Sequence, residues 1–487
     1  MQHRALLAAM AAAALLAACG VVGCGSASTG PSASTGPSAS TASGGATTGP
    51  SSPSPSASSA SPVRAAAWTT YDHDATRSGT DPTSPPAGSL RASWTTPALD
   101  GSVYAQPLVV GASVIVATEG DTVYSLDAAT GAVRWSRHLG APVSGSALPC
   151  GDVDPSGITG TPAVDPATGT VWVVSFTEGA GQVPHHSLWS LDLSTGATTG
   201  QRPADPPGSD PLAEQERGAL ALANSRVYVP YGGLFGDCSD YHGWVLGYPT
   251  SGSGAAVSYE TPTQREAGIW APPGPAVGPD GSLYVATGNG TPTTAVDNSD
   301  SVVRLSPGLH VEATFTPSDF AQLSAHDRDL GSTSPALLPG GLVFQIGKEG
   351  VGYVLAAGHL GGVGGQLSQT QVCTGGFGGD AVDGDMVLAS CFDGLYAVRV
   401  SAGRGAAPPA LTVAWKATGA RPGPPIVSGG VAWVLDRGGA LVGYDLATGA
   451  VRERSTVTVV SAFPTLAAVS GRLFVPSGDR IAAYQGA

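Results

Sequence analysis

Lysine, and charge of either sign, are scarce in this chain. Lys348 and Lys416 are its only lysines, and charged residues make up 12% of the sequence. The net charge of -14 leaves no basic stripe that could neutralise a phosphate backbone. The composition therefore argues against a nucleic-acid partner.

Long hydrophobic runs are also rare, and one of them stands at the N-terminus. The apolar run over residues 5–18 is too short to span a bilayer and fits the core of a secretory signal peptide. It ends in Leu-Ala-Ala-Cys, which resembles the lipobox of bacterial lipoproteins, with Cys19 as the lipidated residue. Cys24 is a second candidate for the lipid, and ordinary secretion after an Ala-x-Ala-like cut is the alternative. We expect an extracytoplasmic protein, anchored to the cell membrane through this lipid or secreted.

Clear helical periodicity is hard to find, whereas glycine and proline are abundant, with 70 and 40 residues. That balance is typical of many short strands joined by tight turns. From 26 to 62 the chain is almost wholly Ser, Thr, Ala, Gly and Pro, which cannot form a core. We therefore expect a signal peptide at 1–18, a lipidated cysteine with a disordered stalk at 19–62, and a folded domain at 63–487.

Cysteine is sparse in the folded domain, which contains four: Cys150, Cys238, Cys373 and Cys391. An even number in an exported protein indicates two disulfides. Of the three possible pairings we favour Cys150 with Cys238 and Cys373 with Cys391, because the second two flank one predicted pair of strands. Buried free thiols are the alternative.

One short segment occurs three times, at 123–131, 188–196 and 441–449. Each copy reads as a strand followed by an Asp-x-x-Thr-Gly turn and a second strand. In the turn the carboxylate of Asp127, Asp192 or Asp445 can accept backbone N–H bonds while the glycine takes a positive φ. Self-similarity of this kind indicates a propeller or a solenoid.

Weaker copies of the unit raise the number of repeats to eight. The last unit lacks an outer strand, whereas residues 90–95 read as an outer strand without a blade. We predict an all-β fold: an eight-bladed β-propeller of four-stranded antiparallel blades, closed by the N-terminal strand. A linear solenoid with polar caps is the alternative. The eight strands that mark the units are 114–120, 170–176, 226–233, 282–290, 342–350, 386–394, 431–439 and 472–479.

The repeat resembles that of the pyrroloquinoline-quinone (PQQ)-like repeat family, whose unit is apolar-x-Ala-x-Asp-x-x-Thr-Gly-x-x-x-Trp. The resemblance covers roughly residues 68–487 by this repeat logic. It implies the eight-bladed propeller of the family's quinoprotein alcohol dehydrogenases, to which the chain is distantly similar. The family also contains propellers that bind no quinone and act as envelope scaffolds.

The resemblance to the dehydrogenases implies a cofactor site in the middle blades. Trp270 would stack on the quinone and Asn289 would bind calcium through its amide carbonyl. Asp329 would take the substrate hydroxyl proton and would also be a ligand of the same ion, and Lys348 would stabilise charge on the reduced quinone. Asp237 would replace a glutamate calcium ligand that has no clear counterpart.

Each of these residues also has a purely structural interpretation. Trp270 can fill space between blades, and Asn289 lies between two glycines in a good left-handed turn. Asp329 can cap a turn, while Lys348 and Glu349 can form a solvated pair.

The expected function follows from these two interpretations of the middle blades. A further departure from the dehydrogenases is that Cys150 stands alone where they have two adjacent cysteines over the quinone. We predict a binding or scaffold module at the cell envelope that holds a protein, glycan or small ligand on one propeller face. The alternative is a PQQ- and Ca²⁺-dependent quinoprotein dehydrogenase that oxidises an alcohol or a sugar.

Overall fold

The computed structural model describes residues 67–179, 183–291, 294–403, 407–459, 461 and 463–487. One compact unit covers Arg64–Ala487. The predicted signal peptide, Cys19, Cys24 and the stalk lie outside the described residues. Within the described part, no helix is long and apolar enough to cross a membrane.

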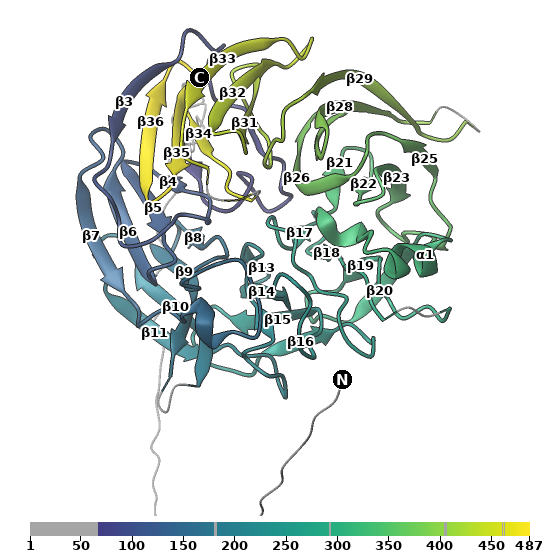
Figure 1. Ribbon diagram of the computed structural model, residues 1–487, viewed down its shortest axis with the longest axis horizontal. Coiled ribbons are helices and arrows are strands. Elements are labelled where there is room, and N and C mark those ends of the chain that lie inside the picture. The colour runs from purple at the N-terminus through teal and green to yellow at the C-terminus, as the bar shows by residue number, and fades with distance from the viewer. Residues whose placement is uncertain (1–66, 180–182, 292–293, 404–406, 460, 462) are drawn as a thin grey trace, which may run out of the picture. The chain divides into compact units, whose positions relative to one another are not determined.

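Eight separate sheets in the described residues form the blades of a ring (Figure 1). The eight-bladed propeller is thereby confirmed. In the first four blades, short strands near the centre of the ring lead outward through longer ones. Blade 1 contains β4 (Leu108–Val110), β5 (Ser113–Ala117), β6 (Thr122–Asp127) and β7 (Val133–His138); blade 2 contains β8 (Ala163–Asp165), β9 (Thr170–Glu178), β10 (Pro184–Asp192) and β11 (Thr198–Pro203); blade 3 contains β13 (Ala221–Ala223), β14 (Arg226–Gly233), β15 (Trp244–Pro249) and β16 (Val257–Glu260); blade 4 contains β17 (Ala276–Val277), β18 (Leu283–Ala286), β19 (Val302–Leu305) and β20 (Val311–Thr316).

Blades 5, 7 and 8 follow the same plan, whereas the inner strand of blade 6 has eight residues. A short helix, α1 (Phe320–Ala325), and two 3-10 turns, η1 (Gly145–Ala147) and η2 (Leu330–Ser332), lie in connections. Blade 5 contains β21 (Ala336–Leu338), β22 (Leu342–Ile346), β23 (Val351–Ala356) and β25 (Ser368–Gln371); blade 6 contains β26 (Gly376–Asp383), β27 (Met386–Cys391), β28 (Gly394–Ser401) and β29 (Ala410–Thr418); blade 7 contains β30 (Ile426–Ser428), β31 (Val431–Asp436), β32 (Ala440–Asp445) and β33 (Val451–Thr456); blade 8 contains β34 (Ala467–Val469), β35 (Arg472–Ser477), β36 (Arg480–Gln485) and the N-terminal β3 (Arg91–Thr95).

The N-terminal strand closes the ring as predicted, because β3 pairs antiparallel with β36 of blade 8. One detail of the prediction needs correction: four of the eight sheets have a fifth strand. Each added strand has two residues, and β2 and β24 run parallel to their neighbours. Such short additions have no alternation that a sequence pattern could reveal. They are β1 (Ala67–Trp68), β2 (Thr80–Asp81), β12 (Glu214–Gln215) and β24 (Gly362–Val363).

Tryptophans on outer strands join neighbouring blades. Trp94 on β3 donates from Nε1 to the Ala128 carbonyl (3.1 Å), in the Asp-x-x-Thr-Gly turn of blade 1. A Cβ added to Gly131 of that turn would lie 2.5 Å from the Trp94 ring, so only glycine allows this approach. Trp135 and Trp415 repeat the contact with blades 2 and 7, through the carbonyls of Leu193 and Leu446. The repeated turn is therefore the docking site for the preceding blade.

The turn itself is fixed by its aspartate. Asp127 Oδ1 accepts from the backbone N–H groups of Ala129 and Thr130, both at 3.0 Å. Hydrogen bonding to Arg134 and then to Thr130 lowers the pKa of Asp127 to about 2. Gly131 closes the turn with φ of 74°, a value at which side chains are strained.

We predict that Gly131→Ala destabilises the propeller more than an alanine at a comparable, open glycine. Gly252 has φ of 75° and nothing within 4 Å of an added Cβ, so Gly252→Ala measures the backbone strain alone. The extra clash with Trp94 should cost about 1–3 kcal/mol more. Urea unfolding of both variants measures the difference, and equal losses would contradict the docking role of the glycine.

Candidate functional site

The predicted site residues come together around one pocket of about 270 Å³, which we call the Trp270 pocket. Trp270 lies between β16 and β17, Asn289 follows β18, and Asp329 directly precedes η2. Lys348 lies in the turn between β22 and β23, and Asp237 in the loop between β14 and β15. All five side chains line the pocket. The residues therefore converge from blades 3, 4 and 5, as the sequence order suggested.

Asp329 is the centre of the polar side of this pocket. It is 3% exposed, and its Oδ2 pairs with the Lys348 ammonium. Its Oδ1 accepts from the Asn289 backbone N–H (2.9 Å). The Asn289 amide orientation that satisfies both residues also places Nδ2 2.6 Å from Oδ1. Three donors thus hold a carboxylate that does not cap η2, since it makes no capping hydrogen bond.

Lys348 is held by two carboxylates. Besides Asp329, its ammonium contacts Asp327 Oδ1 at 2.6 Å. Burial alone would lower the pKa of Lys348, but the charges of Asp329 and Asp327 outweigh burial and raise it above the ordinary value. The ammonium therefore stays charged at neutral pH, and its charge is neutralised locally. It does not form the predicted alternative pair with Glu349, which instead contacts Arg328 (3.5 Å).

The carboxylates of Asp327 and Asp329 hold the Lys348 ammonium, and this arrangement leaves calcium less room to bind. Among the described residues, one group of three His, Cys, Asp or Glu side chains lies close enough to share a metal ion: Cys373, Cys391 and Asp393, whose cysteines form a disulfide. At the predicted calcium site, Lys348 occupies one oxygen of Asp329, so an ion would have to displace it. Calcium binding therefore stays a prediction, and we derive no chemistry from it.

Three aromatic rings also line the pocket; we call Trp270, Phe377 and Phe463 the aromatic wall. The Trp270 ring centroid lies 5.7 Å from Phe377 and 6.3 Å from Phe463. The Lys348 ammonium lies 5.8 Å from the Trp270 centroid, close enough for a cation–π contact. Phe235 lines the rim but is 63% exposed, so it does not fill the pocket. The Trp270 ring is inclined by 54° to Phe377 and by 78° to Phe463, so a flat ring system can stack on one of these rings at a time.

Both predicted disulfides are present, and the first one supports the pocket's rim. Cys150 and Cys238 join the loop after η1 to the loop after β14. An added Cβ on Gly236 would lie 3.4 Å from Cys150 Sγ, so the bond lies against the 234–237 segment that lines the pocket. Asp237 in this segment accepts from the Tyr241 hydroxyl (2.7 Å).

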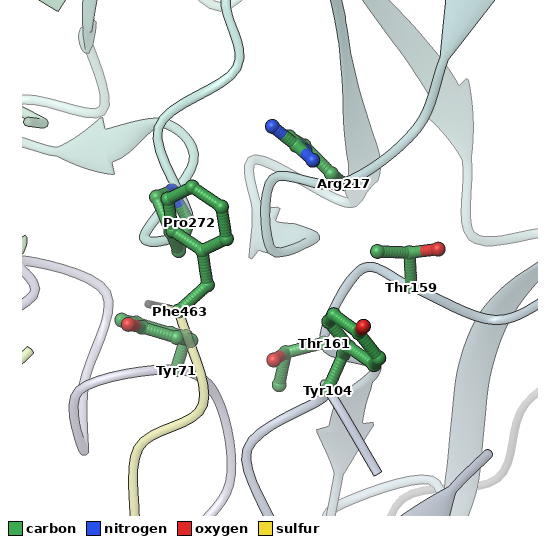
Figure 2. Close-up of a pocket in the computed structure, with 7 residues that line it drawn as sticks. All are labelled: Tyr71, Tyr104, Thr159, Thr161, Arg217, Pro272 and Phe463. Atoms are coloured by element: carbon green, nitrogen blue, oxygen red, sulfur yellow. The ribbon is translucent and has the colours of Figure 1, made fainter. Parts of the chain in front are cut away.

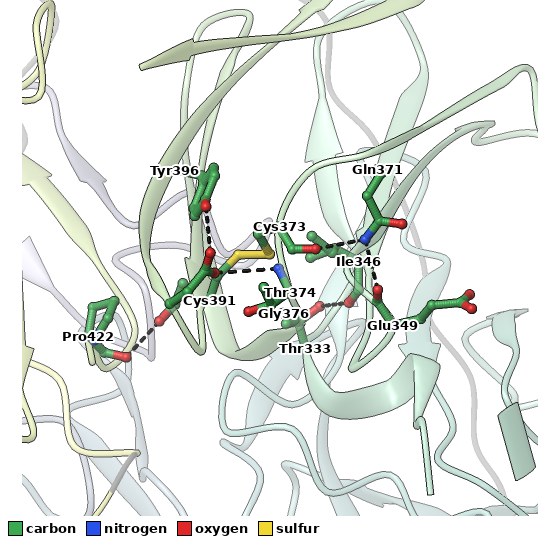
Figure 3. The surroundings of a disulfide bond; sticks show 12 residues. Thr333, Ile346, Glu349, Gln371, Cys373, Thr374, Gly376, Cys391, Tyr396 and Pro422 are labelled. Carbon is green, nitrogen blue, oxygen red and sulfur yellow. Dashed lines mark hydrogen bonds between the residues drawn. A yellow bond between two sulfur atoms is a disulfide. The ribbon is translucent and has the colours of Figure 1, made fainter. Parts of the chain in front are cut away.

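The second disulfide is Cys373–Cys391 (Figure 3). It joins the segment before β26 to the end of β27. Gln371 Nε2 donates to the Cys373 carbonyl (2.7 Å), which restrains the backbone at the first cysteine. Phe377 follows the disulfide on β26, and its ring lies 5.2 Å from that of Phe392. The bond therefore restrains the strand that supplies part of the wall.

Sequence reasoning missed several residues of the site. Phe377 is the second residue of β26, and Phe463 lies in the loop before β34. Arg217 lies between β12 and β13. Asp327 is two residues before Asp329 and shares Lys348 with it. An aspartate two residues from a predicted base was the one available signal.

A protein-family model matches part of the chain. The family described as outer membrane protein assembly factor BamB matches residues 74–236, about a third of the sequence. Together with the eight-bladed fold, this match supports a distant PQQ-like repeat propeller. No curated protein matches it significantly.

Solved structures resemble the whole ring of this PQQ-like propeller. The quinohemoprotein alcohol dehydrogenase ADHIIG from Pseudomonas putida HK5 has a TM-score of 0.65 at 14% identity, covering 86% of this chain and 80% of the dehydrogenase. A europium-containing methanol dehydrogenase gives 0.65 and 14%, with 85% and 90% covered. BamB from Moraxella catarrhalis gives 0.56 and 14%, with 81% and 99% covered. At these identities the likeness concerns the fold alone.

Burial raises the pKa values of two acids of this PQQ-like propeller, Glu119 and Asp300. Burial raises the pKa of Glu119 to about 7 although Gly157 and Thr159 donate to its Oε2. Its Oε1 has no hydrogen-bond partner in the described part of the chain. Burial also raises the pKa of Asp300, beside Asp329, to about 8. These groups are neutral in the folded protein at pH values where they would be ionised in the unfolded chain.

We predict that stability falls as the pH rises from about 4.5 to about 7, because the folded protein holds the Glu119 proton over this range and the unfolded chain releases it. Glu119→Gln should flatten this fall by about 1–3 kcal/mol. Unfolding free energies measured across this range test it. Glu178→Gln, at an exposed carboxyl, is the matched control; an unchanged slope in Glu119→Gln would contradict the assignment.

Proposed function

We propose that this propeller is an extracytoplasmic binding module whose ligand site is the Trp270 pocket. The observation that carries the proposal is the pocket itself: an aromatic wall and a network of paired charges line one space of about 270 Å³. Concave, partly aromatic pockets with a few polar groups are typical of small-ligand sites. The ligand we propose is therefore a small molecule with a flat ring system.

The location of the module is part of the proposal. Two disulfides support an oxidising compartment, and the sequence 1–62 supports export, a lipid on Cys19 and a stalk. The lipid would attach the module to the membrane. A protein or glycan bound on a propeller face is the second partner that the sequence predicts. The matched family's description as an assembly factor is consistent with a binding role.

We expect 2-naphthylmethanol, a neutral flat probe, to bind the purified folded domain with one site per chain. Trp270→Ala removes the largest ring of the wall and should weaken binding at least about 10-fold, the typical cost of losing one stacking partner. Titration calorimetry measures this. Trp189→Ala is the control, because the Trp189 indole bonds Ser175 in blade 2. No binding, or equal loss in both variants, would contradict the proposal.

The second candidate is a PQQ- and Ca²⁺-dependent dehydrogenase that oxidises an alcohol or a sugar. The convergence of Trp270, Asn289, Asp329 and Lys348 favours it. Asp329 would then accept the hydroxyl proton, which requires Lys348 to leave its carboxylate.

Reconstitution separates the two functions. For the binding module we expect no calcium-dependent retention of PQQ after gel filtration and no dye reduction with ethanol above the level of Asp329→Asn. Equimolar retention that needs calcium, together with dye reduction lost in Asp329→Asn, would establish the dehydrogenase instead.

A further inference from the structure

A second, smaller cavity adjoins the Trp270 pocket (Figure 2). Its free volume of about 10 Å³ has room for one water-sized group. Most of its lining comes from segments that lead into inner strands: Tyr104 before β4, Thr161 before β8, Arg217 before β13 and Phe463 before β34. Because inner strands surround the centre of the ring, this cavity lies at the mouth of the central channel.

Arg217 and Phe463 line both cavities. The Arg217 guanidinium stacks on the Phe463 ring, 4.8 Å from its centroid. A ligand bound against the aromatic wall would therefore lie close to the Arg217 guanidinium. Figure 2 shows the guanidinium directed toward Phe463 across the cavity.

Among the described residues, the Arg217 guanidinium has a weak counter-charge, because the carboxylate nearest to it is distant and solvated. Its side chain is 9% exposed, and its nearest carboxylate, Asp152, lies at 3.9 Å and is itself 47% exposed. Its Nε has no hydrogen-bond partner among the described residues. Burial lowers the pKa of Arg217, and a buried guanidinium is stabilised most by a carboxylate that accepts two of its N–H groups.

Tyr104 offers a second donor at the same place. Its hydroxyl makes no hydrogen bond within the described ranges, and the residue lines the small cavity that Arg217 also lines. Burial raises the pKa of Tyr104 to about 12, so the phenol keeps its proton and can donate. Glu119, the nearby acid, holds its own proton up to about pH 7 and so does not neutralise Arg217 below that pH.

Lys348 cannot play the same role, since it is already paired with Asp327 and Asp329. Of the two cations that line the Trp270 pocket, Arg217 is the one that has a buried nitrogen, Nε, with no hydrogen-bond partner among the described residues.

We propose that Arg217 and Tyr104 form a carboxylate subsite at the mouth of the central channel, so that the ligand is an aromatic carboxylate. Its ring lies on the aromatic wall, and one carboxylate oxygen enters the small cavity. The inference rests on the proposed function, because it needs the ring to occupy the Trp270 pocket.

The test compares 2-naphthoate with 2-naphthylmethanol, which share the ring and differ in charge. At pH 6.5 the unaltered protein should bind the acid about 10- to 100-fold more tightly, the range for charge-assisted hydrogen bonds. Arg217→Gln should bring the ratio of the two Kd values near one. Arg217→Lys, which keeps the charge but not the planar fork, should retain part of the preference. Tyr104→Phe should reduce the preference about 3- to 10-fold, as for one lost hydrogen bond.

Arg202→Gln is the matched control, because Arg202 also stacks on an aromatic ring, 4.6 Å from the Tyr248 centroid, away from the pocket. It should leave the ratio unchanged. Equal binding of both probes by the unaltered protein, or a preference that survives Arg217→Gln, overturns the subsite while the pocket stands. If neither probe binds, the proposed function and the subsite both fall.

Discussion

The contact between a tryptophan of one blade and the turn glycine of the next determines the rest of this structure. Trp94 lies on the strand that completes blade 8 and docks on Gly131 in blade 1. The same contact that joins Trp135 to Gly196 within the ring thus also closes it. A closed ring has only short blade edges, and it fixes every inner strand at a set distance from one axis. Loops that are far apart in sequence are thereby held at one mouth.

Many residues of the site lie outside the repeated strand and turn. Each blade contributes a connection before its inner strand, and these connections carry Tyr104, Arg217, Trp270 and Phe463. Each of the two disulfides restrains one part of that region. Charges there lie in a poorly hydrated environment, where an unpaired cation is costly and a ligand's carboxylate is correspondingly favourable. The rigid ring can maintain such a group because the propeller's core, and not the site, supplies the stability.

The sequence predicted the fold well because the repeat is a local signal. Asp127, Thr130 and Gly131 specify their turn whatever surrounds them, and the orphan strand at 90–95 specified the closure. The convergence of Trp270 and Lys348 followed from family order. The contacts of the site residues could not be predicted in this way. Lys348 pairs with Asp329 and not with Glu349 because of how two loops fold. Arg217 contacts Phe463, 246 positions along the chain, only because the ring closes. Such pairings have no spacing that a sequence pattern can express.

The central claim is that one aromatic carboxylate spans the Trp270 pocket and the mouth of the channel. A crystal structure of the folded domain with 2-naphthoate tests it most directly. The account predicts the naphthyl ring against Trp270 and Phe377, with the carboxylate about 2.8 Å from the Arg217 guanidinium nitrogens. A carboxylate paired with Lys348 after displacement of Asp329, or a ring bound outside this pocket, would contradict it.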